Sequence, residues 1–293
     1  MNRQVTYLIS GPAHLPYLVC SLYTLRQHYD GRVVVYVWPE SFDYVYQIAQ
    51  DNRLMIHCIE HEPQLRRKDG IRGNAQFLDK INLTMQLKCS VSLYLDADTT
   101  IHGSLDPLFS AALNDQTGFC ATQFNNWKSN GRTVRSRLSE LLNVKGIPEG
   151  LVKTLTSQEW PSVNGGVWAA TPSSPILAAW YSYTKMCGPL FIADERVLHL
   201  FMPLRNIGVL KANGRYNSSH KYKDPDLASE DVVIWHYHGD SNVRPKKSPL
   251  AFQQWMPIYQ HCLDKNIGNM ADWILNINNK YLREAEEFWG ESK

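Results

Sequence analysis

The first hundred residues alternate between two kinds of hydrophobic pattern. Runs that are apolar at nearly every position predict buried strands, at Val5–Ile9, Val33–Trp38, Leu54–Ile59 and Val91–Leu95. Segments with one polar side lie between them and predict helices, at about Leu15–His28, from an N-cap at Ser41 to about Asp51, and at about Ala75–Lys88. Strand–helix–strand alternation of this kind predicts an α/β fold, with a mostly parallel sheet flanked by helices on both faces.

The second part of the chain is less regular. Further strands are predicted at Gly118–Phe124, Val163–Ala170 and Val232–Trp235, and helices at Pro175–Met186 and Asp194–Phe201. An insertion covers Asn125–Gln158, and the pattern is helical and amphipathic from Leu250 onward. Because no repeat, low-complexity tract or linker interrupts the chain, we predict one domain over residues 1–249, and a C-terminal helical extension of the same domain over residues 250–293.

Composition narrows the class of protein. A net charge of +2 over 293 residues argues against a strongly electrostatic partner. The six scattered cysteines predict reduced thiols and a cytoplasmic protein; the early strand predicts no signal peptide, and no apolar run predicts a membrane span. A nucleic-acid acceptor is a minority alternative, because the insertion carries a basic cluster of Lys128, Arg132, Arg135 and Arg137. The oligomeric state is not predicted.

Two carboxylates end one of the predicted buried strands. Asp96 and Asp98 stand one residue apart directly after Val91–Leu95. In open α/β sheets, ligands bind at the carboxyl ends of the strands. Two acids spaced in this way can hold a hard divalent cation, and such a cation can neutralise a diphosphate. This pattern favours an enzyme that uses a nucleotide-activated substrate, although two solvated acids at a strand end are the simpler alternative.

Four short motifs follow one another along the chain. They are Phe77-Leu78-Asp79-Lys80-Ile81, Tyr94-Leu95-Asp96-Ala97-Asp98-Thr99, Val163-Asn164-Gly165-Gly166-Val167 with Ala193-Asp194-Glu195, and Ile234-Trp235-His236-Tyr237-His238-Gly239. At these residues the chain resembles the glycosyltransferases of family 8, which include glycogenin and bacterial galactosyltransferases. The resemblance spans most of residues 5–239. It implies the Rossmann-like GT-A fold and the transfer of a hexose from a UDP-sugar to a hydroxyl acceptor, with Mn²⁺ or Mg²⁺ as cofactor.

The same resemblance implies roles for individual residues. His236 would be the third metal ligand beside Asp96 and Asp98, because the family has a metal-binding histidine in a His-x-x-Gly segment; a nitrogen ligand favours manganese. Lys80 would face the sugar and phosphates of the donor. Other candidates for binding the donor are Ser10, Gly11, Ala97, Asn164, Gly165 and Gly239. Arg244 or Lys246 would replace a family lysine that contacts phosphate, and the sequence does not indicate which.

Asp194 and Glu195 are the candidate catalytic residues. The resemblance places Asp194 on the hydroxyl groups of the transferred sugar and Glu195 beneath its anomeric carbon, where relatives often carry glutamine. A carboxylate there can stabilise an oxocarbenium-like centre or act as a covalent nucleophile, and transfer with retention of configuration is the expectation. Acidic residues also favour the N-terminus of a helix for purely structural reasons.

Three other functions remain open. An inverting GT-A transferase would use one acid as a general base toward the acceptor. A catalytically silent sugar-nucleotide or glycan-binding module would bind UDP and manganese without turnover. A nucleotidyltransferase shares the sheet type, but it needs a Gly-rich basic loop after the first strand, and Ser10-Gly11-Pro12 lacks that pattern.

Overall fold

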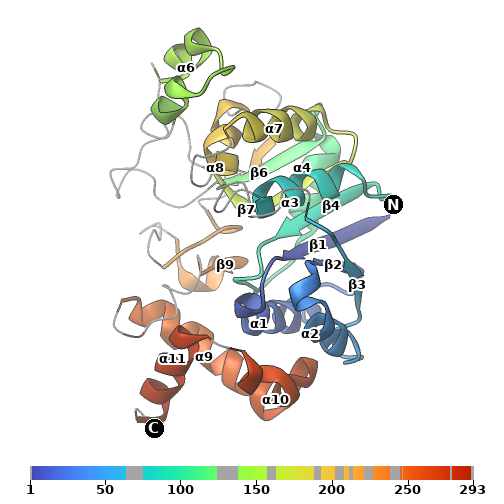
Figure 1. Cartoon of the computed structure of the whole chain (residues 1–293), viewed down its shortest axis with the longest axis vertical. Coiled ribbons are helices and arrows are strands. Elements are labelled where there is room, and N and C mark those ends of the chain that lie inside the picture. The colour runs from blue at the N-terminus through green and yellow to red at the C-terminus, as the bar shows by residue number, and fades with distance from the viewer. Residues whose placement is uncertain are drawn as a thin grey trace.

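The computed structural model describes residues 2–63, 75–123, 138–156, 163–187, 193–201, 208–210, 214–220, 227–237, 245, 247–277 and 279–291. Three candidate site residues, Gly239, Arg244 and Lys246, and the basic cluster of the insertion lie outside this range. The main sheet has seven strands in the order β3-β2-β1-β4-β7-β6-β8. Figure 1 shows most of these strands among the helices that surround them. These strands are β1 (Arg3–Ile9), β2 (Arg32–Val37), β3 (Ile56–Glu60), β4 (Val91–Leu95), β6 (Phe119–Gln123), β7 (Val163–Ala170) and β8 (Gly208–Leu210).

One strand runs against the others. The neighbouring pairs β3–β2, β2–β1, β1–β4 and β6–β8 are parallel, whereas β7 is antiparallel to both β4 and β6. The prediction of a mostly parallel sheet is therefore confirmed. A second sheet, which the hydrophobic pattern did not predict in full, pairs β5 (Thr99–Ile101) with β9 (Ile234–His236) in the antiparallel sense.

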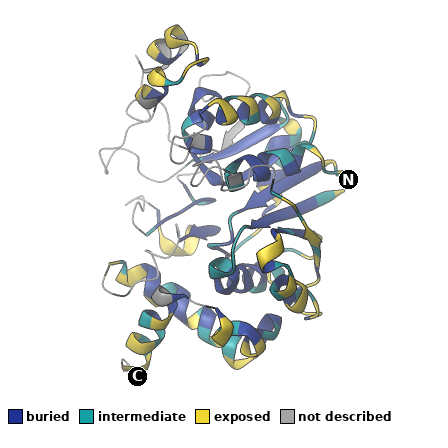
Figure 2. Ribbon diagram, in the orientation of Figure 1, coloured by how far each residue is buried: buried dark blue, intermediate teal, exposed yellow. Residues whose placement is uncertain are grey.

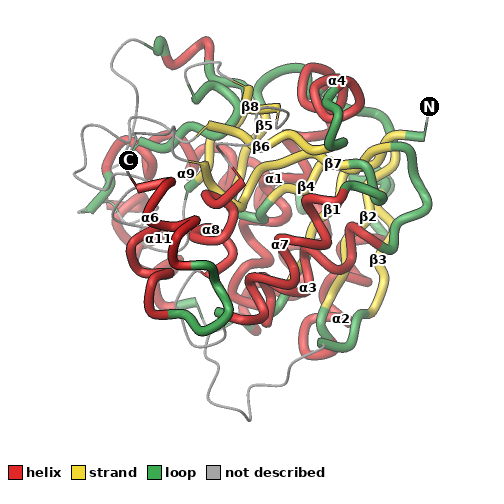
Figure 3. Tube along the Cα trace, turned by 90° about the horizontal axis from the view of Figure 1, so that it is seen from above, coloured by secondary structure: helices red, strands yellow, loops and turns green. Residues whose placement is uncertain are grey.

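Helices cover both faces of the main sheet. One face packs against α1 (Leu15–Arg26), α2 (Pro39–Ala49) and α4 (Asp106–Asn114), and the other against α3 (Ala75–Met85), α7 (Pro175–Met186) and α8 (Ala193–Leu198). The strands are buried between these layers (Figure 2), and the band of strands twists through the surrounding helices (Figure 3). In the described part of the insertion, α6 (Glu149–Thr156) is an α-helix. Short 3-10 turns among the described residues are η1 (Pro12–His14), η3 (Glu140–Asn143), η4 (His199–Phe201), η5 (Ser229–Asp231), η6 (Ile267–Asn269) and η7 (Ile274–Asn276).

The start of α2 corrects one prediction. Ser41 was expected to be its N-cap, but the helix begins at Pro39 with Trp38 as N-cap, and Ser41 is buried inside the first turn. Proline suits the first helical position because its fixed φ is already helical and its missing N–H would have no partner there. Among the residues that the structure describes, no helix is long and apolar enough to cross a membrane, and all six cysteines are free thiols.

The chain after residue 248 forms α9 (Pro249–Asp264), α10 (Met270–Trp273) and α11 (Lys280–Glu291), which lie beyond α1 and α2 in Figure 1. Trp255 of α9 packs on Tyr17 of α1, with ring centroids 5.0 Å apart. Gly268, at φ +62°, brings η6 against α1 and α2, where an added Cβ would lie 3.1 Å from Val19 and 3.3 Å from Ile48. The division at residue 249 stays a prediction, since the extension shares a continuous core with the sheet.

Two charged residues at the end of α2 anchor this extension. Asp51 accepts a hydrogen bond from the Gly268 N–H at 2.6 Å and pairs with Arg53 at 2.7 Å. Arg53 also donates to the carbonyls of Lys265 and Asn266, at 3.0 and 2.7 Å. Burial opposes ionisation of Asp51, but these donors outweigh it and hold its pKa below the ordinary value of 3.8.

We predict that Asp51→Asn lowers the free energy of unfolding by about 2 kcal/mol at neutral pH, because a buried acceptor loses its charge. A lowered pKa contributes stability above pH 3.8, and that contribution is lost as the pH falls through the folded-state value. The difference between wild type and Asp51→Asn should therefore shrink below about pH 4. Urea unfolding at pH 7 and pH 3.5 measures it, with the exposed Asp272→Asn as the control; a difference independent of pH would contradict the account.

Candidate active site

A cavity of about 400 Å³ lies at the carboxyl ends of β1 and β4, beside the start of β7. Ten of the candidate residues line it: Ser10, Lys80, Asp96, Ala97, Asp98, Asn164, Gly165, Asp194, Glu195 and His236. Gly11 does not line the cavity, although its neighbour Ser10 does. The structure thus brings together residues from six separate parts of the sequence, and it places them where ligands bind in open α/β sheets.

The reversed direction of β7 explains part of this convergence. Because β7 is antiparallel to β4, it begins where β4 ends, and Leu95 pairs with Val167. The Asp96 N–H donates to the carbonyl of Gly166 at 2.7 Å. The Asn-Gly-Gly motif therefore lies directly against the two aspartates, although about seventy residues separate them along the chain.

The small sheet brings the histidine to the same place. In the ladder between β5 and β9, His236 is opposite Thr99, the residue that follows Asp98. The Tyr237 N–H donates to the Asp98 carbonyl at 2.7 Å and extends this pairing by one residue. His236 therefore reaches Asp98 through a regular strand ladder and not through a loose loop.

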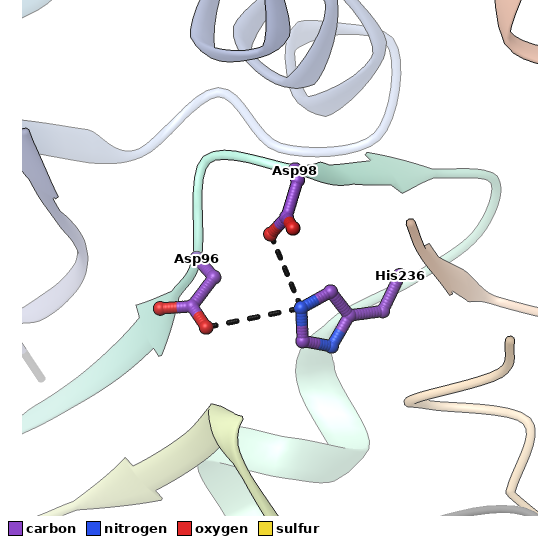
Figure 4. A group of neighbouring side chains, drawn as sticks. All are labelled: Asp96, Asp98 and His236. Carbon is purple, nitrogen blue, oxygen red and sulfur yellow. Dashed lines mark ion pairs between the residues drawn. The ribbon is translucent and has the colours of Figure 1, made fainter. Parts of the chain in front are cut away.

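Asp96, Asp98 and His236 form a compact cluster (Figure 4). Nε2 of His236 lies 3.1 Å from Asp98 Oδ1 and 3.8 Å from Asp96 Oδ2. One ligand atom from each residue lies within 4.8 Å of the others. Ligands about 2.0–2.3 Å from a shared ion have such separations, and two carboxylates with one imidazole suit a divalent cation such as manganese. The three residues therefore fit the predicted metal site.

A chain of hydrogen bonds orients the imidazole. The Thr122 hydroxyl donates to the Val167 carbonyl at 2.6 Å, so its oxygen is left to accept from Asn217 Nδ2 at 2.9 Å. Asn217 Oδ1 consequently faces His236 Nδ1 at 2.9 Å and accepts its proton. This order of donors leaves Nε2 as the ring nitrogen that faces the two carboxylates, which is the arrangement a metal-binding histidine requires.

The electrostatics of the cluster favour positive charge. Burial alone would lower the pKa of His236, but Asp98 and Asp96 outweigh burial and raise it above its ordinary value. Burial raises the pKa of Asp96, and Lys80 and His236 compensate only in part. Carboxylates held this close together are stabilised by a cation between them.

Two glycines make room for the site on opposite sides of β7. A Cβ at Gly166 would overlap His236 Cε1 and lie 2.5 Å from Asp96 Oδ2. A Cβ at Gly165 would lie 2.7 Å from Asp194 Oδ2 and 3.1 Å from Lys80 Nζ. Successive residues of a strand face opposite sides, so Gly166 serves the metal cluster and Gly165 serves a second, ion-paired cluster.

This second cluster is built on a buried salt bridge. Lys80 Nζ lies 2.8 Å from Asp194 Oδ2 and donates to the Gly165 carbonyl at 2.7 Å; both side chains are almost fully buried. Burial alone would lower the pKa of Lys80, but Asp194 and Asp96 raise it, so the ammonium stays charged. Asp194 Oδ1 is buried and has no hydrogen-bond partner among the described residues. A buried acceptor without a donor is costly, so a ligand hydroxyl would satisfy it.

Asn164 and Glu195 complete the wall of the cavity. Asn164 belongs to β7, and its Oδ1 accepts from the Gly166 N–H of the same strand at 2.8 Å. The amide oxygen is therefore held against the backbone of its own strand. The Glu195 carbonyl accepts from His199 Nδ1 at 2.5 Å, and His199 Nε2 accepts from the Val163 N–H at 3.3 Å. Neutral His199 therefore ties the start of β7 to α8 and fixes the backbone that carries Asp194 and Glu195.

Comparison with solved structures identifies the architecture. The chain superposes on the galactosyltransferase LgtC, solved in complex with donor and acceptor sugar analogues, with a TM-score of 0.58 and 14% identity over 88% of this chain and 95% of that one. The glycosyltransferase GlyE of Streptococcus pneumoniae TIGR4 gives 0.52 and 14% over 91% and 64%, and mouse xyloside xylosyltransferase 1 gives 0.52 and 12% over 82% and 99%. The chain has the GT-A fold. By sequence, neither a protein-family model nor a curated protein matches it.

In this GT-A fold, several cavity and supporting residues were not predicted as site residues. Leu8, His14, Gln76, Phe77, Tyr94 and Gly166 also line the cavity. Phe77, Tyr94 and Gly166 stand inside the quoted motifs, so their spacing from Lys80, Asp96 and Asn164 was a usable signal. Asn217, Thr122 and His199 carried no such signal, because their roles depend on contacts between distant segments.

We predict that Gly166→Ala weakens Mn²⁺ binding at least about tenfold, because its Cβ would displace His236 or Asp96. It should also lower the free energy of unfolding by about 1–3 kcal/mol through overpacking. Gly290→Ala on α11 is the matched control, since its Cβ would meet no atom of the described residues within 4 Å. Calorimetric titration with Mn²⁺ measures the affinity; unchanged affinity in Gly166→Ala would contradict the packing described here.

Proposed function

We propose that this chain is a metal-dependent glycosyltransferase that moves a hexose from a UDP-sugar to a hydroxyl acceptor with retention of anomeric configuration. The observation that carries the proposal is one cavity of a GT-A fold in which a carboxylate–carboxylate–imidazole cluster lies beside a buried Lys–Asp pair. The first cluster suits a cation with a diphosphate, and the second suits a sugar. Either cluster alone would support a much less specific function.

A divalent cation held by Asp96, Asp98 and His236 would offset the charge that develops on the diphosphate leaving group. Lys80 adds a fixed positive charge on the side of β7 opposite the metal cluster. Its ammonium has three N–H donors, and Asp194 Oδ2 and the Gly165 carbonyl take two of them. The ammonium lines the cavity, and we assign its remaining donor to a phosphate or sugar oxygen.

Asp194 and Asn164 offer complementary groups to the sugar. Within the part of the chain that the structure describes, the Oδ1 atom of Asp194 is a buried acceptor without a partner, and a sugar hydroxyl is the donor we assign to it. The oxygen of Asn164 is held by the Gly166 N–H, so this side chain presents its amino group and acts as a donor. An acceptor and a donor at fixed positions can orient one sugar ring.

We assign to Glu195 the position beside the anomeric carbon, which is the atom that reacts. Its side chain is buried in the cavity wall next to Asp194, and His199 holds its backbone. A buried carboxylate here would stabilise positive charge at the anomeric carbon or attack it, and the second route gives retention after two displacements. Ser10 and Ala97 line the rest of the cavity and are assigned to the nucleotide; Gly11, Gly239, Arg244 and Lys246 stay predictions.

The proposed function predicts UDP release from a UDP-hexose in the presence of Mn²⁺. A panel of UDP-sugars with a coupled UDP assay measures this, with simple sugars as trial acceptors. Asp98→Ala should lower the rate at least about a hundredfold, because the cation loses a ligand, whereas the exposed Asp272→Ala should keep it.

Four outcomes separate the alternatives. Release that survives Asp98→Ala, or no release and no UDP binding, would contradict the proposal. Binding of UDP and Mn²⁺ without turnover would make the chain a silent binding module, and an inverted product anomer would make it an inverting transferase. A nucleic-acid acceptor stays a minority alternative, because the basic cluster of the insertion lies outside the described residues.

A further inference from the structure

The metal-cluster residue His236 stands between two large side chains that point away from the cavity. Side chains alternate along β9, so Trp235 and Tyr237 face the side opposite the His236 imidazole. Both are about 1% exposed. Their polar and ring contacts include Thr100 of β5, Gln254 of α9 and His220.

A single atom of α9 contacts both Tyr237 and the histidine ring that packs on Trp235. Gln254 Oε1 accepts a hydrogen bond from the Tyr237 hydroxyl at 3.1 Å and also bonds to His220 Nε2. The His220 ring lies flat on Trp235, with centroids 4.1 Å apart and an interplanar angle of 2°. Gln254 therefore holds Tyr237 directly and holds Trp235 through His220.

In the hydrogen bonds from Thr100 to Tyr237 and from Tyr237 to Gln254, each hydroxyl donates toward the carboxamide oxygen of Gln254. Because the Tyr237 hydroxyl donates its proton to Gln254, its oxygen accepts from Thr100 Oγ1 at 3.2 Å. Thr100 belongs to β5 and is opposite Trp235 in the strand ladder. Thr100 Oγ1 in turn lies 2.8 Å from His102 Nε2. The carboxamide oxygen of Gln254 is thus the final acceptor of a partly buried network that joins β5, β9 and α9.

We propose that Gln254 is a positioning residue for the metal cluster. It fastens the C-terminal extension to the back of β9 and so holds His236 Nε2 at the distance from Asp96 and Asp98 that a shared cation requires. Metal–ligand distances tolerate errors of only about 0.2 Å, so a small shift of β9 is enough to weaken binding. The inference rests on the metal site of the proposed function and deepens it, because it makes the extension part of that site.

The test compares variants of two adjacent glutamines on α9. Gln254→Leu should weaken Mn²⁺ binding about tenfold, whereas Gln253→Leu, at an exposed position of the same helix, should change it less than about twofold. Gln254→Glu keeps an acceptor oxygen and should retain most of the Mn²⁺ affinity of the wild type. Tyr237→Phe removes the hydroxyl that donates to Gln254 and accepts from Thr100, and it should weaken binding in the same direction. The dissociation constant is measured by titration calorimetry, and the melting temperature of each metal-free variant is measured alongside it.

The outcomes distinguish this inference from the proposed function. If Gln254→Leu and Tyr237→Phe lower the melting temperature but leave Mn²⁺ affinity unchanged, Gln254 has a structural role only and the inference is overturned. If wild-type protein binds no Mn²⁺, the metal dependence of the proposed function fails, and the inference fails with it. A weakened Gln254→Leu variant with normal binding in Gln253→Leu and recovery in Gln254→Glu supports it.

Discussion

The site depends on how closely β7 approaches the end of β4. The hydrogen bond from the Asp96 N–H to the Gly166 carbonyl, 2.7 Å long, fixes this approach. The absence of a Cβ at both Gly165 and Gly166 allows side chains to crowd both sides of the strand at that point. A strand without those two glycines would hold the metal cluster and the Lys80–Asp194 pair farther apart or displace one of them.

Charge balance explains how so many ionisable groups tolerate burial in one place. Lys80 compensates Asp194, and its charge also reaches Asp96; His236 compensates Asp98 and Asp96. Unpaired buried charges are very costly, so such a set persists only when each charge has a partner. The remaining imbalance is negative around Asp96 and Asp98, and no described residue donates to Asp194 Oδ1. A cation and a hydroxyl-rich ligand satisfy these two needs together.

The order of strands and helices could be predicted from local hydrophobic patterns. Asp96 and Asp98 could be predicted as site residues in the same way, because a buried strand is apolar at every position and its end is polar. The partners of those aspartates, His236 and Lys80, were predicted only from motif resemblance. β5 and β8 are three-residue strands, too short to give a pattern. α2 begins at Pro39 because the fixed φ of proline favours the first helical position more strongly than Ser41 favours the capping position. Asn217 and Gln254 act through segments far apart along the chain, which no local pattern reports.

The account depends most directly on three side chains sharing one ion. Crystals grown with Mn²⁺ and UDP, and measured at the manganese absorption edge, would locate that ion by its own anomalous signal. We expect one anomalous peak about 2.0–2.3 Å from His236 Nε2 and from a carboxylate oxygen of Asp96 and of Asp98. A peak elsewhere in the molecule, or no peak beside His236 in crystals that bind UDP, would contradict the account.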